Sequence, residues 1–159
     1  MLQNSCAEKS AMTPTRDDTA GSASLAGLLN GEINFPLGLL GFPASRRFIL
    51  KRFEPGDGSV SPFLILDSLD EELSFPVIPA HYIAADYAVP VFPELLHSLG
   101  AQCESELLPL LIVTVRDRLE NSTVNLQGPL LISAGSRVAM QLVVEELPLR
   151  QPLVLPATP

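Results

Sequence analysis

Four acidic residues crowd one short stretch of the chain: Asp67, Asp70, Glu71 and Glu72. Two neighbouring carboxylates can act as acid and base, so a hydrolase that uses Asp67 and Asp70 is one hypothesis. A glycosidase-like pair needs a cleft lined with aromatic side chains, but the chain has only seven Phe, two Tyr and no Trp. Acidic residues on a strand and its following turn usually face water. We therefore expect that the protein is not an enzyme.

The other reactive side chains form no recognisable site in the sequence. His81 and His97 stand sixteen positions apart without metal-ligand spacing. Two cysteines, Cys6 and Cys103, are too few for a disulfide framework or a zinc site. The G-x-S-x-G pattern of a nucleophilic serine is absent. We expect no catalytic residue, no metal and no cofactor.

The charges of the chain are unevenly placed. Ten Lys and Arg against eighteen Asp and Glu give a net charge of -8, which disfavours direct nucleic-acid binding. No Lys or Arg occurs from Phe53 to Val115, whereas this stretch holds Glu54, Asp57, Asp67, Asp70, Glu71, Glu72, Asp86, Glu94, Glu104 and Glu106. This segregation predicts an anionic surface that could steer a basic protein partner. The alternative is that the acidity only keeps the protein soluble.

Frequent proline and glycine residues divide the chain into segments of strand length. They favour an all-β, mainly antiparallel, small β-barrel-like domain with one short helix. Alternation at residues 137–145 places Val138, Met140, Leu142 and Val144 on one strand face, paired through a turn with residues 129–132. Further strands are expected at 47–53, 63–69, 73–78, 110–116 and 123–126. The helix spans residues 93–99, between Pro93 and Gly100.

The first 30 residues differ from the rest, because they are rich in small polar residues and lack a sustained apolar period. We expect residues 1–30 to be a disordered extension, with one helical turn near residues 25–29, and residues 31–159 to form the domain. No apolar run approaches membrane-spanning length, and no secretory signal is evident at the start. A cytoplasmic protein without membrane contact is the expectation.

Five blocks of the sequence, in order, resemble the FliW family of flagellar assembly factors. They are FPLGLLGF at 35–42, SPFLILDSL at 61–69, SFPVI at 74–78, IVTV at 112–115 with STVNLQGPLLI at 122–132, and LPLRQP at 147–152. Gln151 stands where the family often has His, and Asp67 where Gln is common. Phe35, Pro36, Asn125 and Pro129 match the most repeated family positions, and we expect structural roles for them.

The resemblance implies a non-enzymatic, monomeric protein that binds flagellin before export. It also implies binding to CsrA, a small basic RNA-binding protein that represses translation of the flagellin message, so that flagellin synthesis is coupled to export. The candidate partner-contact residues are acidic: Asp67, Asp70, Glu71, Asp86, Glu145 and Glu146. The alternative function is a small β-barrel carrier of an apolar ligand, which a deep apolar pocket would favour.

Overall fold

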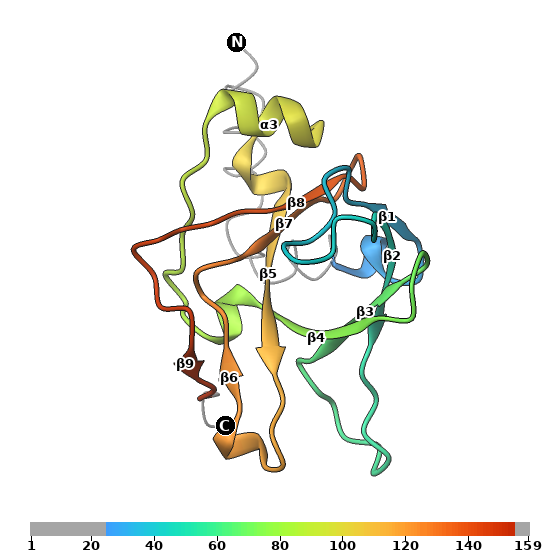
Figure 1. Ribbon diagram of the computed structural model, residues 1–159, viewed down its shortest axis with the longest axis vertical. Coiled ribbons are helices and arrows are strands. Elements are labelled where there is room, and N and C mark those ends of the chain that lie inside the picture. Colours follow the sequence, from blue (N-terminus) through green and yellow to red (C-terminus); the bar gives the residue numbers. More distant parts are fainter. Residues whose placement is uncertain (1–24, 155–159) are drawn as a thin grey trace, which may run out of the picture.

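The computed structural model describes residues 25–154, which form one strongly bent antiparallel sheet with a short helix at one end (Figure 1). The strands are β1 (Glu32–Asn34), β2 (Arg47–Arg52), β3 (Leu64–Ser68), β4 (Ser74–Pro79), β5 (Leu107–Thr114), β6 (Thr123–Val124), β7 (Leu130–Ser133), β8 (Ala139–Gln141) and β9 (Gln151–Pro152). The helix is α3 (Pro93–Leu99), and single 3-10 turns are η1 (Ala80–Tyr82), η2 (Glu104–Glu106) and η3 (Leu119–Asn121).

The strands follow the order β1-β2-β3-β4-β5-β6-β9, and β7 pairs with both β5 and β8. Every ladder is antiparallel, as predicted. The sheet is not closed by a continuous ladder. Instead, one isolated parallel bridge between Asn34 and Val138 joins β1 to the residue before β8. The described chain contains no helix of the length and apolarity needed to cross a membrane.

The concave side of the sheet is filled by side chains from nearly all strands. Phe35 and Phe48 are fully buried there, with ring centroids 5.1 Å apart in an edge-to-face contact. A second cluster around Ile78, Leu111 and Val124 packs under β4, β5 and β6. The interior is therefore a packed core and not a ligand-filled lumen.

Helix α3 has the predicted bounds. Pro93 opens it, and Gly100 ends it in the left-handed conformation with φ 68°. Leu95 and Leu99 bury against Leu131 of β7. Helix α3 therefore covers the outer side of the β7–β8 hairpin.

The strand predicted at residues 137–145 is shorter than expected. Arg137 has φ 61°, so the strand starts only after it, and β8 ends at Gln141. The N–H of Leu142 still donates to the Pro129 carbonyl at 2.9 Å, but Pro129 has no N–H to return, which ends the ladder. Three of the four residues expected on one face (Val138, Met140 and Leu142) do pack together around Leu95 and Leu99, whereas buried Val144 lies beyond the strand.

The folded unit starts before residue 31. Residues 25–28 form the expected helical turn, and Leu28 is fully buried in the main core. The guanidinium of Arg137 holds this turn by donating to the carbonyl oxygens of Gly27, Leu28 and Glu32. Residues 25–30 thus belong to the domain, and the rest of the predicted extension, residues 1–24, lies outside the described residues.

Candidate functional site

Asp70, in the tight turn between β3 and β4, is engaged by the start of β2. Its Oδ2 accepts the backbone N–H groups of Arg46 and Arg47, both at 2.8 Å. Its Oδ1 accepts Nε of Arg47 and faces Nη2 of the same guanidinium, both at 2.9 Å. The Arg46 N–H and then the Arg47 groups lower the pKa of this carboxyl below its usual 3.8. Asp70 fastens the β3–β4 turn to β2.

Asp67 and Glu71 are held in similar ways. Asp67 on β3 accepts the hydroxyl of Ser74 on β4 and pairs with Nζ of Lys51 on β2 at 3.0 Å. The Ser74 hydroxyl is the main cause that lowers the pKa of Asp67, and Lys51 adds to it. Glu71 accepts the hydroxyl of the fully buried Ser45. We name Asp67, Asp70 and Glu71 the hairpin acids.

These contacts show that the stretch without Lys or Arg, from Phe53 to Val115, does not form a surface free of positive charge. The strand β2 lies beside β3, so Arg47 forms an ion pair with Asp70 and Lys51 forms one with Asp67. Both acids lie in the stretch of sequence that has no Lys or Arg. The two carboxylates considered for hydrolysis have lowered pKa values, while a general acid needs a raised one. The hairpin acids therefore hold the β3–β4 turn on β2, and neither Asp67 nor Asp70 has the raised pKa of a general acid.

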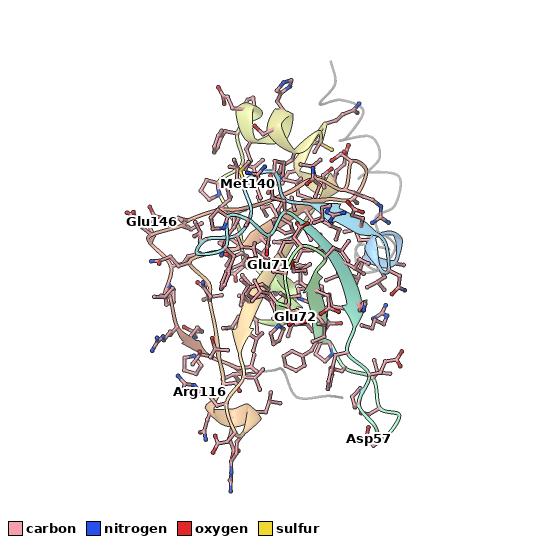
Figure 2. All side chains as sticks on the ribbon, turned by 45° about the vertical axis from the view of Figure 1, so that its right-hand side comes forward. Asp57, Glu71, Glu72, Arg116, Met140 and Glu146 are labelled. Atoms are coloured by element: carbon pink, nitrogen blue, oxygen red, sulfur yellow. The ribbon has the colours of Figure 1, made fainter. Side chains whose placement is uncertain are left out.

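The other three candidate acids lie in two loops that contact the chain at residues 126 and 127. The hydroxyl of Tyr87 donates to the Leu126 carbonyl at 2.9 Å, and the N–H of Val144 donates to the Gln127 carbonyl at 2.7 Å. The neighbouring residues in the two loops, Asp86, Glu145 and Glu146, are exposed. Figure 1 shows both loops on the same side of the sheet, and Figure 2 shows Glu146 well apart from Glu71 and Glu72.

We name Asp86, Glu145 and Glu146 the edge acids. Within residues 25–154, their carboxylates make no hydrogen bond or ion pair with protein groups. Their charges are therefore available to a partner, unlike those of Asp67 and Asp70.

The four residues matched to the family motif have structural positions. Phe35 is fully buried, and Pro36 begins the turn after β1. The side-chain oxygen of Asn125 accepts the N–H groups of Gln127 and Gly128, both at 2.9 Å, and so fixes the bend between β6 and β7. Pro129 is buried where the β7–β8 ladder ends. Asn125 thus shapes the backbone that both loops bearing the edge acids contact.

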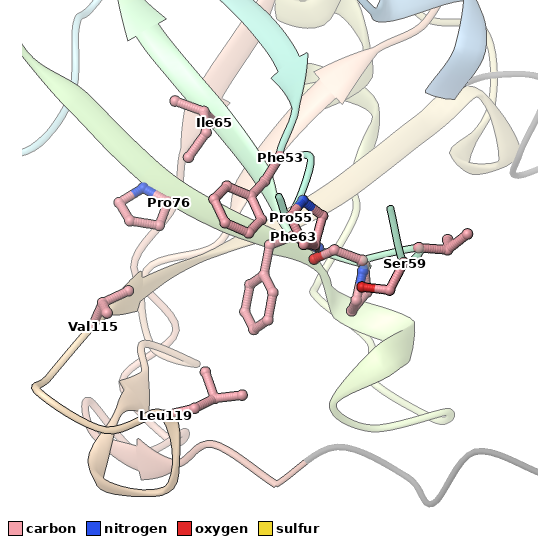
Figure 3. Close-up of a pocket in the computed structure, with 11 residues that line it drawn as sticks. Phe53, Pro55, Ser59, Phe63, Ile65, Pro76, Val115 and Leu119 are labelled. Carbon is pink, nitrogen blue, oxygen red and sulfur yellow. Dashed lines mark hydrogen bonds between the residues drawn. The ribbon is translucent and has the colours of Figure 1, made fainter. Parts of the chain in front are cut away.

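An apolar groove, which no pattern in the sequence predicted, lies at the opposite end of the sheet from α3. Its volume is about 490 Å³. Phe53, Pro55 and Val60 of the β2–β3 loop form one wall, and Val115 and Leu119 of the β5–β6 turn form the other (Figure 3). Its floor includes Ile65 and Pro76, a cross-strand pair of β3 and β4.

The groove forms because two hairpins diverge. The β4–β5 ladder ends at Val77 and Ile112, beside Pro76, which has no N–H for further pairing. The β2–β3 loop precedes β3 and the β5–β6 turn follows β5, and the groove lies between these two connections. Isolated apolar residues in those loops, such as Val60 and Leu119, were the only sign of the groove in the sequence.

Residues 25–154 contain no cluster of three or more side chains suited to hold a metal ion.

Known proteins resemble this chain over most of its length. The family model described as FliW protein matches residues 23–153. The chain belongs to the FliW family. A flagellar assembly factor FliW of Clostridium tetani is 32% identical over 124 residues, which cover 76% of this chain and 83% of that protein. Its counterpart in Geobacter sulfurreducens is 35% identical over 114 residues, covering 71% of this chain and 69% of that protein.

A solved structure has the same fold. The crystal structure of the flagellar assembly factor FliW superposes with a TM-score of 0.65 and 24% identity, over 77% of this chain and 83% of that one. The bent antiparallel sheet of this chain is therefore a fold that is also seen in a solved FliW protein.

Proposed function

We propose that this protein is a cytoplasmic flagellar assembly factor that binds flagellin and also binds and antagonises CsrA. The observation that carries the proposal is family membership: the FliW model spans residues 23–153, and relatives above 30% identity are named flagellar assembly factors. In this role the protein holds newly made flagellin. Once flagellin is exported, the released protein sequesters CsrA, and translation of the flagellin message resumes.

The distribution of charge supports a basic partner and favours the edge acids as its docking site. The chain carries a net charge of -8, which favours fast encounter with a basic protein such as CsrA. The hairpin acids are occupied by Arg46, Arg47, Lys51 and serine hydroxyls. We therefore assign the first CsrA contact to the edge acids, and retain the hairpin acids as secondary candidates.

The carrier alternative has less support. An apolar ligand inside a small barrel needs an enclosed lumen, but Phe35, Phe48 and Leu110 fill the interior here. The apolar groove is open at the surface between two loops (Figure 3). Such a position suits an extended chain segment better than a small enclosed molecule.

The test uses the purified full chain with purified flagellin and CsrA. We expect each protein to co-elute with it in size-exclusion chromatography, and we expect flagellin to release CsrA from a preformed complex. In a cell-free translation reaction with flagellin message, CsrA should repress synthesis, the chain should restore it, and added flagellin should cancel the restoration. A chain that binds neither protein would overturn the proposal, and binding flagellin without CsrA would remove its regulatory half.

A further inference from the structure

The apolar groove exposes large side chains that proteins usually cover. Val60 is 95% exposed, Val115 57%, Leu119 51% and Phe53 45%, all within one hollow. Contiguous exposed apolar surface of this kind marks a binding site. The rings of Phe53 and Phe63 lie close together in the groove, and Leu119 extends towards Phe63 from the opposite wall (Figure 3).

The end of the described chain leads towards this groove. The strand β9 runs antiparallel to β6, with Gln151 opposite Val124 and Pro152 opposite Thr123. This direction carries the chain towards the β5–β6 turn. The N–H of Leu153 donates to the Ser122 carbonyl at 3.0 Å, and the N–H of Ser122 donates to the Leu119 carbonyl, also at 3.0 Å. The described chain therefore ends beside the turn that forms one wall.

The five residues that follow have a composition suited to the groove. Residues 155–159 read Leu-Pro-Ala-Thr-Pro, with no charged side chain and with prolines in P-x-x-P spacing. Such segments favour the extended polyproline II conformation and dock in grooves lined by aromatic rings. At about 3.1 Å per residue, five residues reach about 15 Å.

We propose that residues 155–159 bind in the apolar groove as an extended segment, with their prolines against Phe53 and Phe63. The isolated protein then covers its own apolar surface. A partner that uses the groove has to displace this segment, which makes it a built-in competitor. The inference does not depend on flagellin or CsrA, because it concerns only contacts within one chain.

The test compares the full chain with a variant that ends at Val154, using NMR of methyl-labelled protein. Truncation should shift the methyl signals of Val60, Val115 and Leu119. The methyl signals of Leu37 and Leu40, exposed on the separate β1–β2 loop, serve as the internal control and should stay in place. Adding the five-residue peptide in excess to the truncated protein should move the shifted signals back towards their original positions.

A second variant keeps the chain length and changes only the packing. The double substitution Pro156→Gly and Pro159→Gly should reproduce most of the methyl signal shifts that truncation causes. Glycine removes both the contacts of the proline rings and the preference for an extended backbone. Unchanged Val60, Val115 and Leu119 signals in both variants would overturn the proposal. Signals that depend on protein concentration and not on truncation would also overturn it, by assigning the groove to a second copy of the chain.

Discussion

The hairpin acids and the edge acids have the same side-chain chemistry but opposite surroundings. Asp70 receives two backbone N–H groups and a bidentate guanidinium, all at 2.8 to 2.9 Å, and Asp67 pairs with Lys51 at 3.0 Å. Asp86, Glu145 and Glu146 stand in loops and point their charges at water. Whether an acidic side chain is bound within the fold or left exposed is therefore decided by which strand lies beside it.

The difference has a simple origin in the sheet topology. Asp67 lies on β3, and Asp70 and Glu71 lie in the turn that follows it. The neighbouring strand β2 carries Lys51, which pairs in register with Ile65, and Arg47, whose carbonyl accepts the N–H of Leu69. The loops that carry the edge acids run along the bend at residues 125–129, whose polar groups are backbone carbonyls and an amide. We expect substitutions at the hairpin to change stability, and substitutions at the edge acids to change association.

The largest expected effect lies in the core beneath the hairpin. Phe48 on β2 is fully buried against Phe35 and pairs in register with Ser68. Phe48→Ala should lower the free energy of unfolding by about 3–5 kcal/mol, because it removes a buried ring and leaves a cavity. Phe42→Ala is the matched control, since its ring also makes an edge-to-face contact, 5.4 Å from that of Phe75, but is 37% exposed.

Urea denaturation followed by circular dichroism measures both variants. Equal losses for Phe48→Ala and Phe42→Ala would contradict the placement of β2 in the core. If Phe48→Ala does not fold at all, Phe48→Leu gives a smaller loss that can still be compared with Phe42→Leu.

The next effect separates the hairpin acids from ordinary surface acids. Asp70→Asn keeps the shape of the side chain but removes the charge that accepts the Arg46 and Arg47 groups. We expect a melting temperature several degrees lower at neutral pH. Glu72→Gln in the same turn is the control and should leave the melting temperature nearly unchanged, because within residues 25–154 the Glu72 carboxylate makes no hydrogen bond or ion pair.

The pH dependence of that difference has a definite sign. The folded-state pKa of Asp70 lies below its ordinary 3.8, so the stabilisation is complete above that value. It is lost as the pH falls below 3.8 through the lowered folded-state pKa. The melting temperatures of the parent and of Asp70→Asn should therefore converge in acid. If the difference in melting temperature between the parent and Asp70→Asn stays constant down to strongly acidic pH, packing and not charge is its cause.

The sequence predicted the elements that have strong local signals. Alternation and proline–glycine boundaries located β2 to β5 and β7 within a few residues, and Pro93 with Gly100 bounded α3 correctly. The strands β1 and β9 were missed because three and two residues are too few to show alternation. The helical turn at residues 25–29 was predicted, but so short a turn does not show whether it packs on the domain, and the burial of Leu28 was therefore not foreseen.

The functional surfaces were less predictable, because they depend on which elements become neighbours. The absence of bases from Phe53 to Val115 indicated one anionic face, but β2 brings Arg47 and Lys51 into it. A structural role for Asn125 was expected from its match to the family motif, and its side-chain oxygen does accept two backbone N–H groups. The apolar groove needs two loops that are more than fifty residues apart in sequence, and no local pattern records that contact.

A charge-reversal variant tests the edge acids directly. Replacing Asp86, Glu145 and Glu146 together with Lys should slow association with CsrA at least about tenfold, equivalent to about 1.4 kcal/mol. The effect should shrink at high salt, because exposed charges are screened over a Debye length of about 8 Å at physiological ionic strength. Thermal unfolding should change little, since these carboxylates hold no described part of the fold.

The control variant carries the same change of net charge at other exposed acids, Glu32, Glu54 and Glu72. Stopped-flow association rates at low and high salt compare the two variants. If both slow association equally, only the overall charge matters, and the edge acids are not the docking surface.

The smallest expected effect concerns Tyr87, which anchors the loop that carries Asp86. Its hydroxyl donates to the Leu126 carbonyl at 2.9 Å, so Tyr87→Phe should lower the free energy of unfolding by about 1 kcal/mol.

Burial raises the pKa of Tyr87 to about 12 from an ordinary 10.0. The folded state therefore keeps this proton longer than the unfolded chain does. Its stabilising contribution is complete below pH 10 and is lost as the pH rises through about 12. Tyr82→Phe removes the other tyrosine of the chain, so that phenolate absorbance then reports Tyr87 alone. If Tyr87 in that variant titrates near the ordinary pKa of 10.0, its hydroxyl is solvated. The loop that carries Asp86 would then lack its hydrogen bond to the carbonyl of Leu126.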